Sequence, residues 1–144
     1  MKKVIVTGVS GQVGSYMCEY LLENTDYIIY GAVRRLSVPN HKNIDQIDNP
    51  RFKIISMDLS DPQSINGCIE SIKPDYFINL AANSFVGTSW HMPINHMTVN
   101  CLAVLHQLES IRRHCPNCRY YNAGSSEEFG DVIYSPQDLS LIHI

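Results

Sequence analysis

The sequence predicts an α/β fold, a doubly wound parallel sheet with helices on both faces. Three observations predict it. Short apolar segments alternate with amphipathic ones along the chain, and the apolar segments lack the polar alternation of half-exposed strands. A glycine-rich turn directly follows the first apolar segment. Because strand–helix–strand crossovers are right-handed by strong preference, the strand order expected for such a chain is 3-2-1-4-5.

The first half of the chain is expected to hold three strands and one helix. Residues 4–6 form a short β-branched run, and apolar residues recur at helical spacing over about 13–24. The apolar runs at 27–33 and 52–56 predict the second and third strands. Between these strands, residues 36–50 carry polar groups and two prolines, which predicts a loop with room for a short helix.

The second half is expected to hold two helices and two strands. Asp-Pro at 61–62 places a proline at the first position of a helix, and Lys-Pro-Asp at 73–75 ends it. Residues 76–80 predict the fourth strand and 119–123 the fifth. A long helix is expected over about 94–113. The apolar stripe that should face the core on this helix comprises Met97, Cys101, Val104, Leu105, Leu108 and Ile111.

Length and composition restrict the class of protein. The 144 residues fit one domain, which we assign to 1–138 with an atypical tail at 139–144, and 44% of them are hydrophobic. The net charge of −3 argues against a nucleic-acid partner, because phosphate neutralisation needs an excess of Lys and Arg. No apolar run reaches the ~18 residues of a membrane span, and the N-terminal run is too short for a signal peptide. A cytoplasmic protein without a membrane partner is expected.

Five cysteines without a secretion signal predict free thiols in a reducing compartment. Cys115 and Cys118 have the Cys-x-x-Cys spacing of zinc and redox sites. A zinc site needs two more ligands, no second cysteine pair exists, and the adjacent His114 does not complete a tetrahedron. We therefore predict two ordinary thiols in a helix-to-strand turn and no metal site.

The glycine-rich turn predicts a phosphate site. Gly8, Gly11 and Gly14 lie between the first strand and the first helix with the spacing Gly-x-x-Gly-x-x-Gly. Glycines let the backbone turn tightly and approach a pyrophosphate without an intervening Cβ. The amino end of a helix adds free N–H groups and a positive dipole. The alternative is a glycine-rich turn that holds no ligand.

The residues after the second strand indicate which dinucleotide is bound. NAD-dependent enzymes place Asp or Glu there, which hydrogen-bonds the ribose 2′-hydroxyl. Here the residues are Arg34 and Arg35, whose guanidinium groups can hold a 2′-phosphate. The position predicts NADP as the cofactor, and a basic surface pair without a ligand is the alternative.

These features resemble the extended short-chain dehydrogenase/reductase family, and the Asp-Leu at 58–59 and Asn-Leu-Ala-Ala at 79–82 match it as well. Within the family, the chain is most similar to the GDP-mannose 4,6-dehydratase group, at 7–16, 33–37 and 80–86. The resemblance implies an incomplete, Rossmann-like NADP-binding domain. The cofactor-binding residues that it implies are Gly8, Ser10, Gly11, Gln12, Val13, Gly14, Arg34, Arg35, Ser37, Asp58, Leu59, Leu80, Ala81, Ala82 and Ser84.

The resemblance also implies two catalytic residues. In sugar-nucleotide dehydratases, the loop after the fifth strand carries Ser or Thr, followed two residues later by Glu. Ser125 is then expected to bond the hexose 4-hydroxyl, and Glu127 to help remove the C5 proton and eliminate water from C6. Ser126 between them fits the GDP-mannose group, whereas dTDP-glucose dehydratases have Asp there. The implied reaction converts GDP-mannose to GDP-4-keto-6-deoxy-mannose through NADP. Plain surface charge at Glu127 and Glu128 is the alternative, and another nucleotide sugar is left open.

The chain departs from the family after Glu127. The family's Tyr-x-x-x-Lys pair, in which Tyr takes the 4-hydroxyl proton and Lys lowers its pKa, is absent, and Tyr134 is followed four residues later by Asp138. A truncation, a frameshifted tail or a cloning scar would each account for the unfamiliar tail at 139–144. Two functions are left open. One is the cofactor half of a dehydratase, or of a related epimerase or reductase, inactive alone. The other is a non-catalytic dinucleotide-binding module. A homo-oligomer is left open as well.

Overall fold

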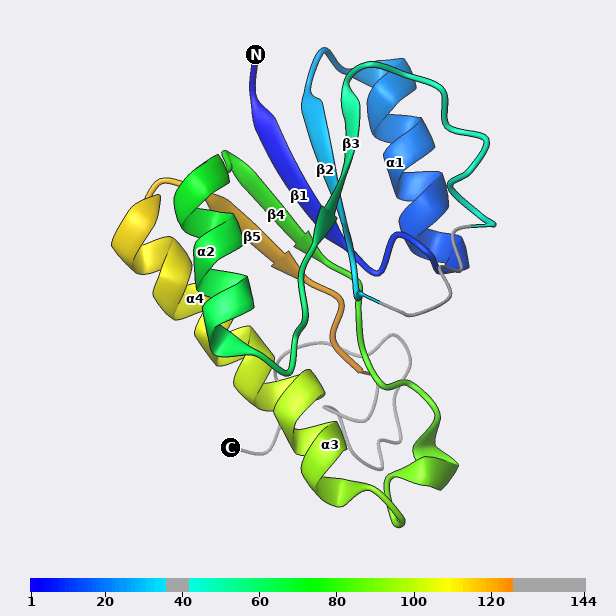
Figure 1. The fold of residues 1–144 in the computed structure, drawn as a ribbon, viewed down its shortest axis with the longest axis vertical. Helices are drawn as coiled ribbons and strands as arrows, with labels where there is room; N and C mark the ends of the chain where they lie inside the picture. Colours follow the sequence, from blue (N-terminus) through cyan, green and yellow to red (C-terminus); the bar gives the residue numbers. More distant parts are fainter. Residues whose placement is uncertain (36–41, 126–144) are drawn as a thin grey trace, which may run out of the picture.

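Five parallel strands form the centre of the molecule (Figure 1). The computed structural model describes residues 1–35 and 42–125. The strands are β1 (Lys3–Thr7), β2 (Ile28–Val33), β3 (Phe52–Ser56), β4 (Tyr76–Asn79) and β5 (Arg119–Asn122). Their order is β3-β2-β1-β4-β5, so the predicted topology is confirmed. In the register of the central strand, Val4 lies opposite Ile29 on one side and Tyr76 on the other. Because all pairs are parallel, the carboxyl ends of the strands lie at one edge of the sheet.

The first two helices begin and end close to their sequence signals. α1 (Gln12–Asn24) follows the glycine-rich turn, and α2 (Pro62–Ile72) begins with its proline. The Asp61 side chain accepts a hydrogen bond from the Gln63 N–H and so caps α2. Lys73 ends this helix in the left-handed region, at φ 50°. The described part of the loop between β2 and β3 contains no helix.

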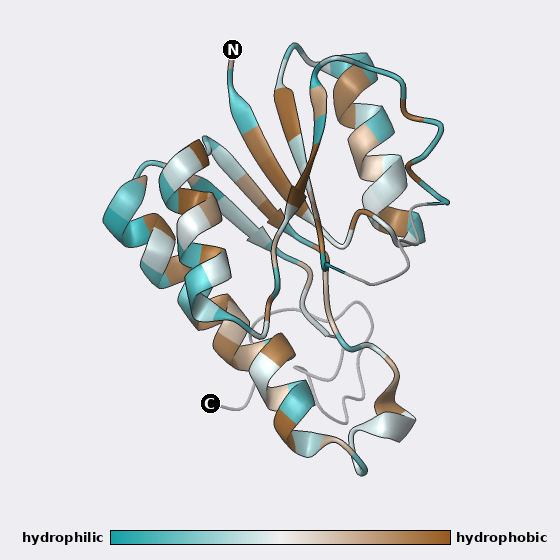
Figure 2. Cartoon of the chain, viewed as in Figure 1, coloured by the Kyte–Doolittle hydropathy of each residue, from teal (hydrophilic) through white to brown (hydrophobic). Residues whose placement is uncertain are grey.

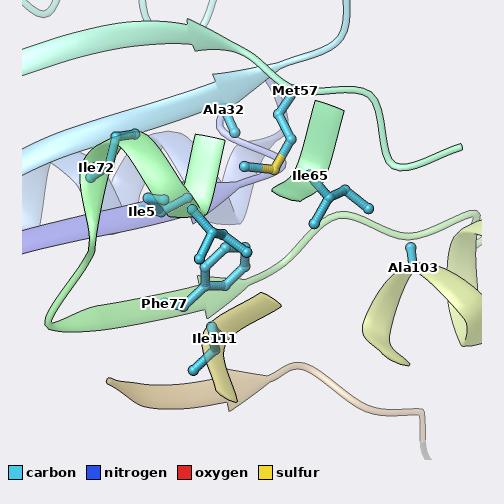
Figure 3. Close-up of a cluster of buried hydrophobic side chains, with 9 residues drawn as sticks. Ile5, Ala32, Met57, Ile65, Ile72, Phe77, Ala103 and Ile111 are labelled. Atoms are coloured by element: carbon cyan, nitrogen blue, oxygen red, sulfur yellow. The ribbon is translucent and has the colours of Figure 1, made fainter. Parts of the chain in front are cut away.

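Both faces of the sheet are covered by apolar side chains. Val4 and Val6 pack against α1 together with Ile44 from the loop between β2 and β3. Ile5 points to the opposite face, as alternation along a strand requires, toward α2 and α4 (Ala103–His114). Figure 3 shows the cluster on this second face, whose other labelled members are Ala32, Met57, Ile65, Ile72, Phe77, Ala103 and Ile111. In Figure 2 the centre of β1 is brown, as expected for a strand buried on both sides.

The segment expected as one helix over 94–113 is divided. α3 (Pro93–Met97) leads into a π-helical turn at Thr98–Leu102, and α4 follows. Most of the predicted core stripe is wrong: Ile111 is buried and Val104 half-buried, but the exposed members are Met97, Cys101, Leu105 and Leu108. The residues that α4 buries are Ala103, Gln107, Ser110 and Ile111. A π turn holds more residues than an α turn, so it rotates the positions after it relative to those before it.

Candidate functional site

The turn between β1 and α1 brings strand and helix into direct contact. Gly8 has φ 72°, in the left-handed region, and its carbonyl accepts a hydrogen bond from the Gly11 N–H at 3.0 Å. A Cβ on Gly14 would lie 2.2 Å from the Gly8 carbonyl oxygen, and a Cβ on Gly8 would lie 3.0 Å from the Ala81 backbone nitrogen. Side chains at these two positions would therefore push apart the strand, the helix and the loop after β4.

The first turn of α1 offers backbone N–H groups to a ligand. The residue before this helix is Gly11, which has no side chain, so no side chain at this position caps the first turn. The first N–H groups of a helix have no partner inside the helix, and its amino end is the positive end of the macrodipole. Such an end, reached through glycine backbone, suits an anionic group such as a phosphate.

A pocket of about 460 Å³ opens beside this turn, at the carboxyl edge of the sheet. This edge is where open α/β sheets bind their ligands. The predicted cofactor residues that line the pocket are Gly8, Ser10, Gly11, Arg34, Asp58, Leu59, Leu80, Ala81, Ala82 and Ser84. The fold thus brings together residues from the separate loops after β1, β2, β3 and β4.

Other predicted residues do not reach this pocket. Those that are described but do not line it are Gln12, Val13, Gly14, Arg35 and Ser125. The first three begin α1, Arg35 is exposed next to Arg34, and Ser125 lies just beyond β5, exposed at the same edge of the sheet. Ser37, Glu127 and the tail at 139–144 fall outside the described residues.

Two opposite charges come to the pocket from the ends of β2 and β3. The Asp58 carboxylate accepts hydrogen bonds from the N–H and the hydroxyl of Ser60, at 2.9 and 2.6 Å. These bonds hold the pKa of Asp58 below its ordinary value, and the positive charge of Arg34 adds to the lowering. Asp58 is therefore an ionised acceptor at neutral pH, while Arg34 presents donors to an anion.

A buried hydroxyl joins the glycine-rich turn to the loop after β4. Thr7, the last residue of β1, accepts hydrogen bonds on Oγ1 from the N–H groups of Leu80 and Ala81, both at 3.1 Å. The same hydroxyl donates to Oδ1 of Asn79 at 2.7 Å. The start of the loop after β4, which lines the pocket, is thus held by one buried side chain and not by backbone pairing alone.

Side-chain amides extend these bonds to β5 and α4. Asn79 donates through Nδ2 to Oδ1 of Asn122 at 2.8 Å, and its own Oδ1 also accepts from Nε2 of Gln107 at 3.3 Å. The Tyr120 hydroxyl donates to Oε1 of Gln107 at 2.6 Å. Within the described residues, every buried side-chain nitrogen and oxygen has a hydrogen-bond partner. We call Thr7, Asn79, Gln107, Tyr120 and Asn122 the amide network.

A second set of amides fastens the loop after β4 to the helical segment. Asn100, in the π-helical turn, accepts from the Asn83 N–H at 2.8 Å and donates to the Asn83 carbonyl at 3.0 Å. The Asn83 side chain donates to Oδ1 of Asn95 on α3 at 2.6 Å. Asn83 and Asn95 both line the pocket, so the π-helical turn helps to shape one of its walls.

Sequence reasoning missed several residues that line the pocket, namely Thr7, Ala32, Val33, Met57, Ser60, Asn83, Asn95 and Val99. Some carried a signal, since Thr7 directly follows the first predicted strand and Val33 ends the second. Ser60 follows Asp58 with the spacing of a side-chain-capped turn. Asn95 and Val99 come from α3 and the π-helical turn, and no periodic pattern in the sequence indicates that this segment reaches the pocket.

The cysteines and the other potential metal ligands form no second site in the part of the chain that the structure describes. Cys115 directly follows α4 and Cys118 precedes β5, in the predicted helix-to-strand turn. Burial raises the pKa of both thiols, that of Cys118 to about 12. Across residues 1–35 and 42–125, no cluster of His, Cys, Asp and Glu could hold a metal ion. In the same residues, no helix has both the length and the hydropathy that spanning a bilayer requires.

Comparison of the sequence with protein families and curated proteins gives a consistent result. The family described as GDP-mannose 4,6 dehydratase matches residues 5–140. A GDP-mannose 4,6-dehydratase of Yersinia enterocolitica is 37% identical over 95% of this chain and 39% of the relative. GDP-mannose 4,6 dehydratase 1 of Arabidopsis thaliana is 38% identical over 91% of this chain and 39% of the relative. The chain spans about two fifths of the length of these relatives.

Solved structures share the fold at lower identity. The Bordetella bronchiseptica enzyme WbmH, in complex with NAD+, superposes with a TM-score of 0.79 at 23% identity, over 97% of this chain and 45% of that one. The dTDP-glucose 4,6-dehydratase of Bacillus anthracis, in complex with NAD, gives 0.75 at 20% identity, over 92% of this chain and 40% of that one. Both likenesses show that this chain shares the fold of those proteins.

Proposed function

The chain belongs to the GDP-mannose 4,6-dehydratase family, and we propose that it is the NADP-binding part of an enzyme that converts GDP-mannose to GDP-4-keto-6-deoxy-mannose. The observation that carries the proposal is the pocket beside the glycine-rich turn, which combines an uncapped helix end with the side chain of Arg34. The first suits a pyrophosphate and the second a 2′-phosphate.

The dinucleotide would bind with its phosphates at the glycine-rich turn. Gly8 and Gly11 line the pocket, and without side chains they keep the turn compact at the amino end of α1, where a phosphate would bind. Arg34 would bind the 2′-phosphate of the adenosine ribose, and Asp58 would accept hydrogen bonds from the adenine base of the same cofactor. When bound, a nicotinamide cofactor supplies a hydride acceptor that is regenerated in each cycle.

The loops after β4 and β5 would serve the reacting end of the cofactor and the sugar. Leu80, Ala81 and Ala82 would form the wall against the nicotinamide, a role implied by the family resemblance and supported by their place in the pocket. Ser125 would bond the hexose 4-hydroxyl, and Glu127 would act on the C5 proton. Ser125 lies at the same edge of the sheet, just beyond β5.

The 144 residues contain no Tyr-x-x-x-Lys pair after Glu127 to take the 4-hydroxyl proton. General acid–base groups contribute about 10²- to 10⁴-fold to a rate. The chain alone is therefore expected to bind the cofactor without turning over GDP-mannose, and a longer protein that carries such a pair is expected to be active. Dehydratase activity of the 144-residue chain, assayed by formation of the 4-keto sugar, would contradict this assignment.

Calorimetric titration with NADP+ and NAD+ tests the choice of cofactor. Arg34→Ala removes a charge-assisted hydrogen bond, worth about 1.5–3 kcal/mol, so affinity for NADP+ should fall roughly ten- to a hundredfold while affinity for NAD+ changes little. Arg35→Ala is the matched control, because Arg35 is exposed outside the pocket and should have the smaller effect. An unchanged preference in both variants would rule out a 2′-phosphate site at this position.

A further inference from the structure

We propose that Gln107 on α4, acting with Tyr120 on β5, is a positioning residue for the nicotinamide half of the cofactor site. Its two hydrogen bonds join Asn79 to Tyr120 and complete the amide network, and the completed network holds the loop after β4 in place. The inference rests on the proposed function for the identity of the ligand, but the effect on the loop can be measured without any ligand.

The direction of the network is set at Thr7. A hydroxyl has one proton to donate and two lone pairs that accept. Both lone pairs of the Thr7 oxygen are occupied by the N–H groups of Leu80 and Ala81. The proton must therefore point to the remaining partner, Asn79, which has to present its oxygen and not its nitrogen to Thr7.

Each later bond then has only one direction. Since Oδ1 of Asn79 faces Thr7, its Nδ2 faces Asn122 and must donate, so Asn122 presents an oxygen. Gln107 approaches the same Asn79 oxygen and must present its NH₂ group. Its own oxygen is then turned toward Tyr120, whose hydroxyl donates to it. An amide flip at any one of these residues would set two donors or two acceptors against each other.

Gln107 is the member of the amide network that lies on a helix and not on the sheet. Its side chain is 0% exposed, in the middle of a helix whose other buried residues include Ala103 and Ile111. A buried amide costs free energy unless both of its ends are bonded, and an apolar side chain would avoid that cost. Gln107 meets the requirement by bonding β4 at one end and β5 at the other. This placement links α4 to both strand ends.

The network acts on one half of the pocket. Leu80 and Ala81 line the pocket themselves, and Ala81 lies against Gly8. Arg34 and Asp58, on the other half, come from the ends of β2 and β3, and the Asp58 carboxylate accepts its hydrogen bonds from Ser60 and not from the network. Loosening the network should therefore weaken contacts with the nicotinamide end and spare contacts with the adenosine end.

The first test compares two probes on the full 144-residue chain. NADPH spans the whole site, and adenosine 2′,5′-bisphosphate carries only the adenosine half. Gln107→Met keeps the length of the side chain and removes its hydrogen bonds. The affinity for NADPH should fall about tenfold, whereas the affinity for the bisphosphate should stay within about twofold of that of the parent chain. Gln63→Met, at an exposed position of α2, is the matched control and should change neither affinity.

The second test measures amide hydrogen exchange without ligand. In Gln107→Met, the N–H groups of Leu80 and Ala81 should exchange at least about tenfold faster, while the Ile29 N–H, which donates to Arg51 in the other half of the sheet, keeps its rate. A merely structural role would raise exchange at all three positions together. Uniform acceleration, or no change at Leu80 and Ala81, would overturn the proposal.

Tyr120→Phe supplies a second variant that retains the ring stacked on Phe77 and removes only the hydroxyl. It should shift the ratio of the two affinities in the same direction as Gln107→Met, and the double variant should shift it no further than Gln107→Met alone. Additive shifts would overturn the role of Tyr120. If the parent chain binds neither probe, the proposed function is wrong, and the exchange rates at Leu80 and Ala81 still decide whether Gln107 positions the loop.

Discussion

The two halves of the pocket are built by different means. In the glycine-turn half, formed by the loops after β1, β2 and β3, the ligand would meet backbone N–H groups and charged side chains that follow directly from their own strands. In the amide half, formed by the loop after β4 together with α3 and the π-helical turn, the backbone is held by side chains from distant parts of the chain. The bonds from Asn79 reach Thr7, Gln107 and Asn122, which are 72, 28 and 43 residues away in sequence.

This difference shows which half depends on local sequence and which on the completed fold. The glycine-turn half needs a strand, a tight turn and a helix in succession, and those form from contiguous residues. The amide half acquires its shape only when β1, β4, β5 and α4 have all come together. A single change should therefore damage the first half through steric exclusion and the second through unsatisfied polar groups.

The largest effect is expected from breaking the glycine-turn half at Gly14. In Gly14→Ala, the new methyl group would lie 2.2 Å from a backbone oxygen that cannot swing aside, so unfolding should become easier by about 3 kcal/mol or more. Chemical denaturation measures the change. Gly67→Ala is the control, because nothing lies within 4 Å of the added Cβ, and it should stabilise α2 by about 0.5–1 kcal/mol. Equal stability of the two variants would contradict the contact between α1 and β1.

The next effect is expected from breaking the amide half at Thr7. Thr7→Val keeps the shape of the side chain but leaves the N–H groups of Leu80 and Ala81 without their acceptor, which should cost about 2–3 kcal/mol in the free energy of unfolding. Thr98→Val removes an exposed hydroxyl that bonds only within its own helical segment and should change stability by less than about 0.5 kcal/mol. Urea titration of both variants at one pH gives the comparison. A Thr7 variant as stable as the Thr98 variant would show that the network is dispensable.

The smallest effect is expected from Asp58, whose contribution to stability depends on pH. The folded-state pKa of Asp58 is depressed, so its ionised form adds stability that is present above the unfolded-state value near 4 and is lost as the pH falls through the folded-state value. Because Asp58 is partly exposed, the contribution should be only about 0.5 kcal/mol. The parent chain should therefore exceed Asp58→Asn in melting temperature at pH 7, and the gap should close as the pH falls below about 4. A gap that stays constant over this range would exclude Asp58 as the titrating group.

The fold and the glycine-turn half could be predicted from the sequence because their signals are local. The apolar runs at 4–6 and 52–56 are strands, although only the first is buried, and Gly8 directly follows the first strand. Arg34 and Asp58 could be placed at the pocket because the carboxyl ends of parallel strands share one edge.

The amide half could not be predicted in the same way. Asn79, Gln107 and Asn122 are polar residues with no shared period, and only the assembled fold brings their side chains together. The face of α4 was mistaken because the π-helical turn changes the register between Met97 and Ala103, and because the side facing the sheet holds a glutamine where apolar periodicity favours leucine. Local patterns describe backbone preferences well, but they do not indicate which polar groups will become partners.

The contact between Gly14 and the Gly8 carbonyl also has a kinetic consequence. The turn is clamped between β1 and α1 before any ligand arrives, so the conformational entropy of ordering it is lost when the chain folds and not when a nucleotide binds. A nucleotide phosphate would therefore meet a surface that already has its bound shape. Association with the glycine-turn half should then follow a single exponential whose rate rises linearly with nucleotide concentration, without the plateau that a slow loop rearrangement imposes.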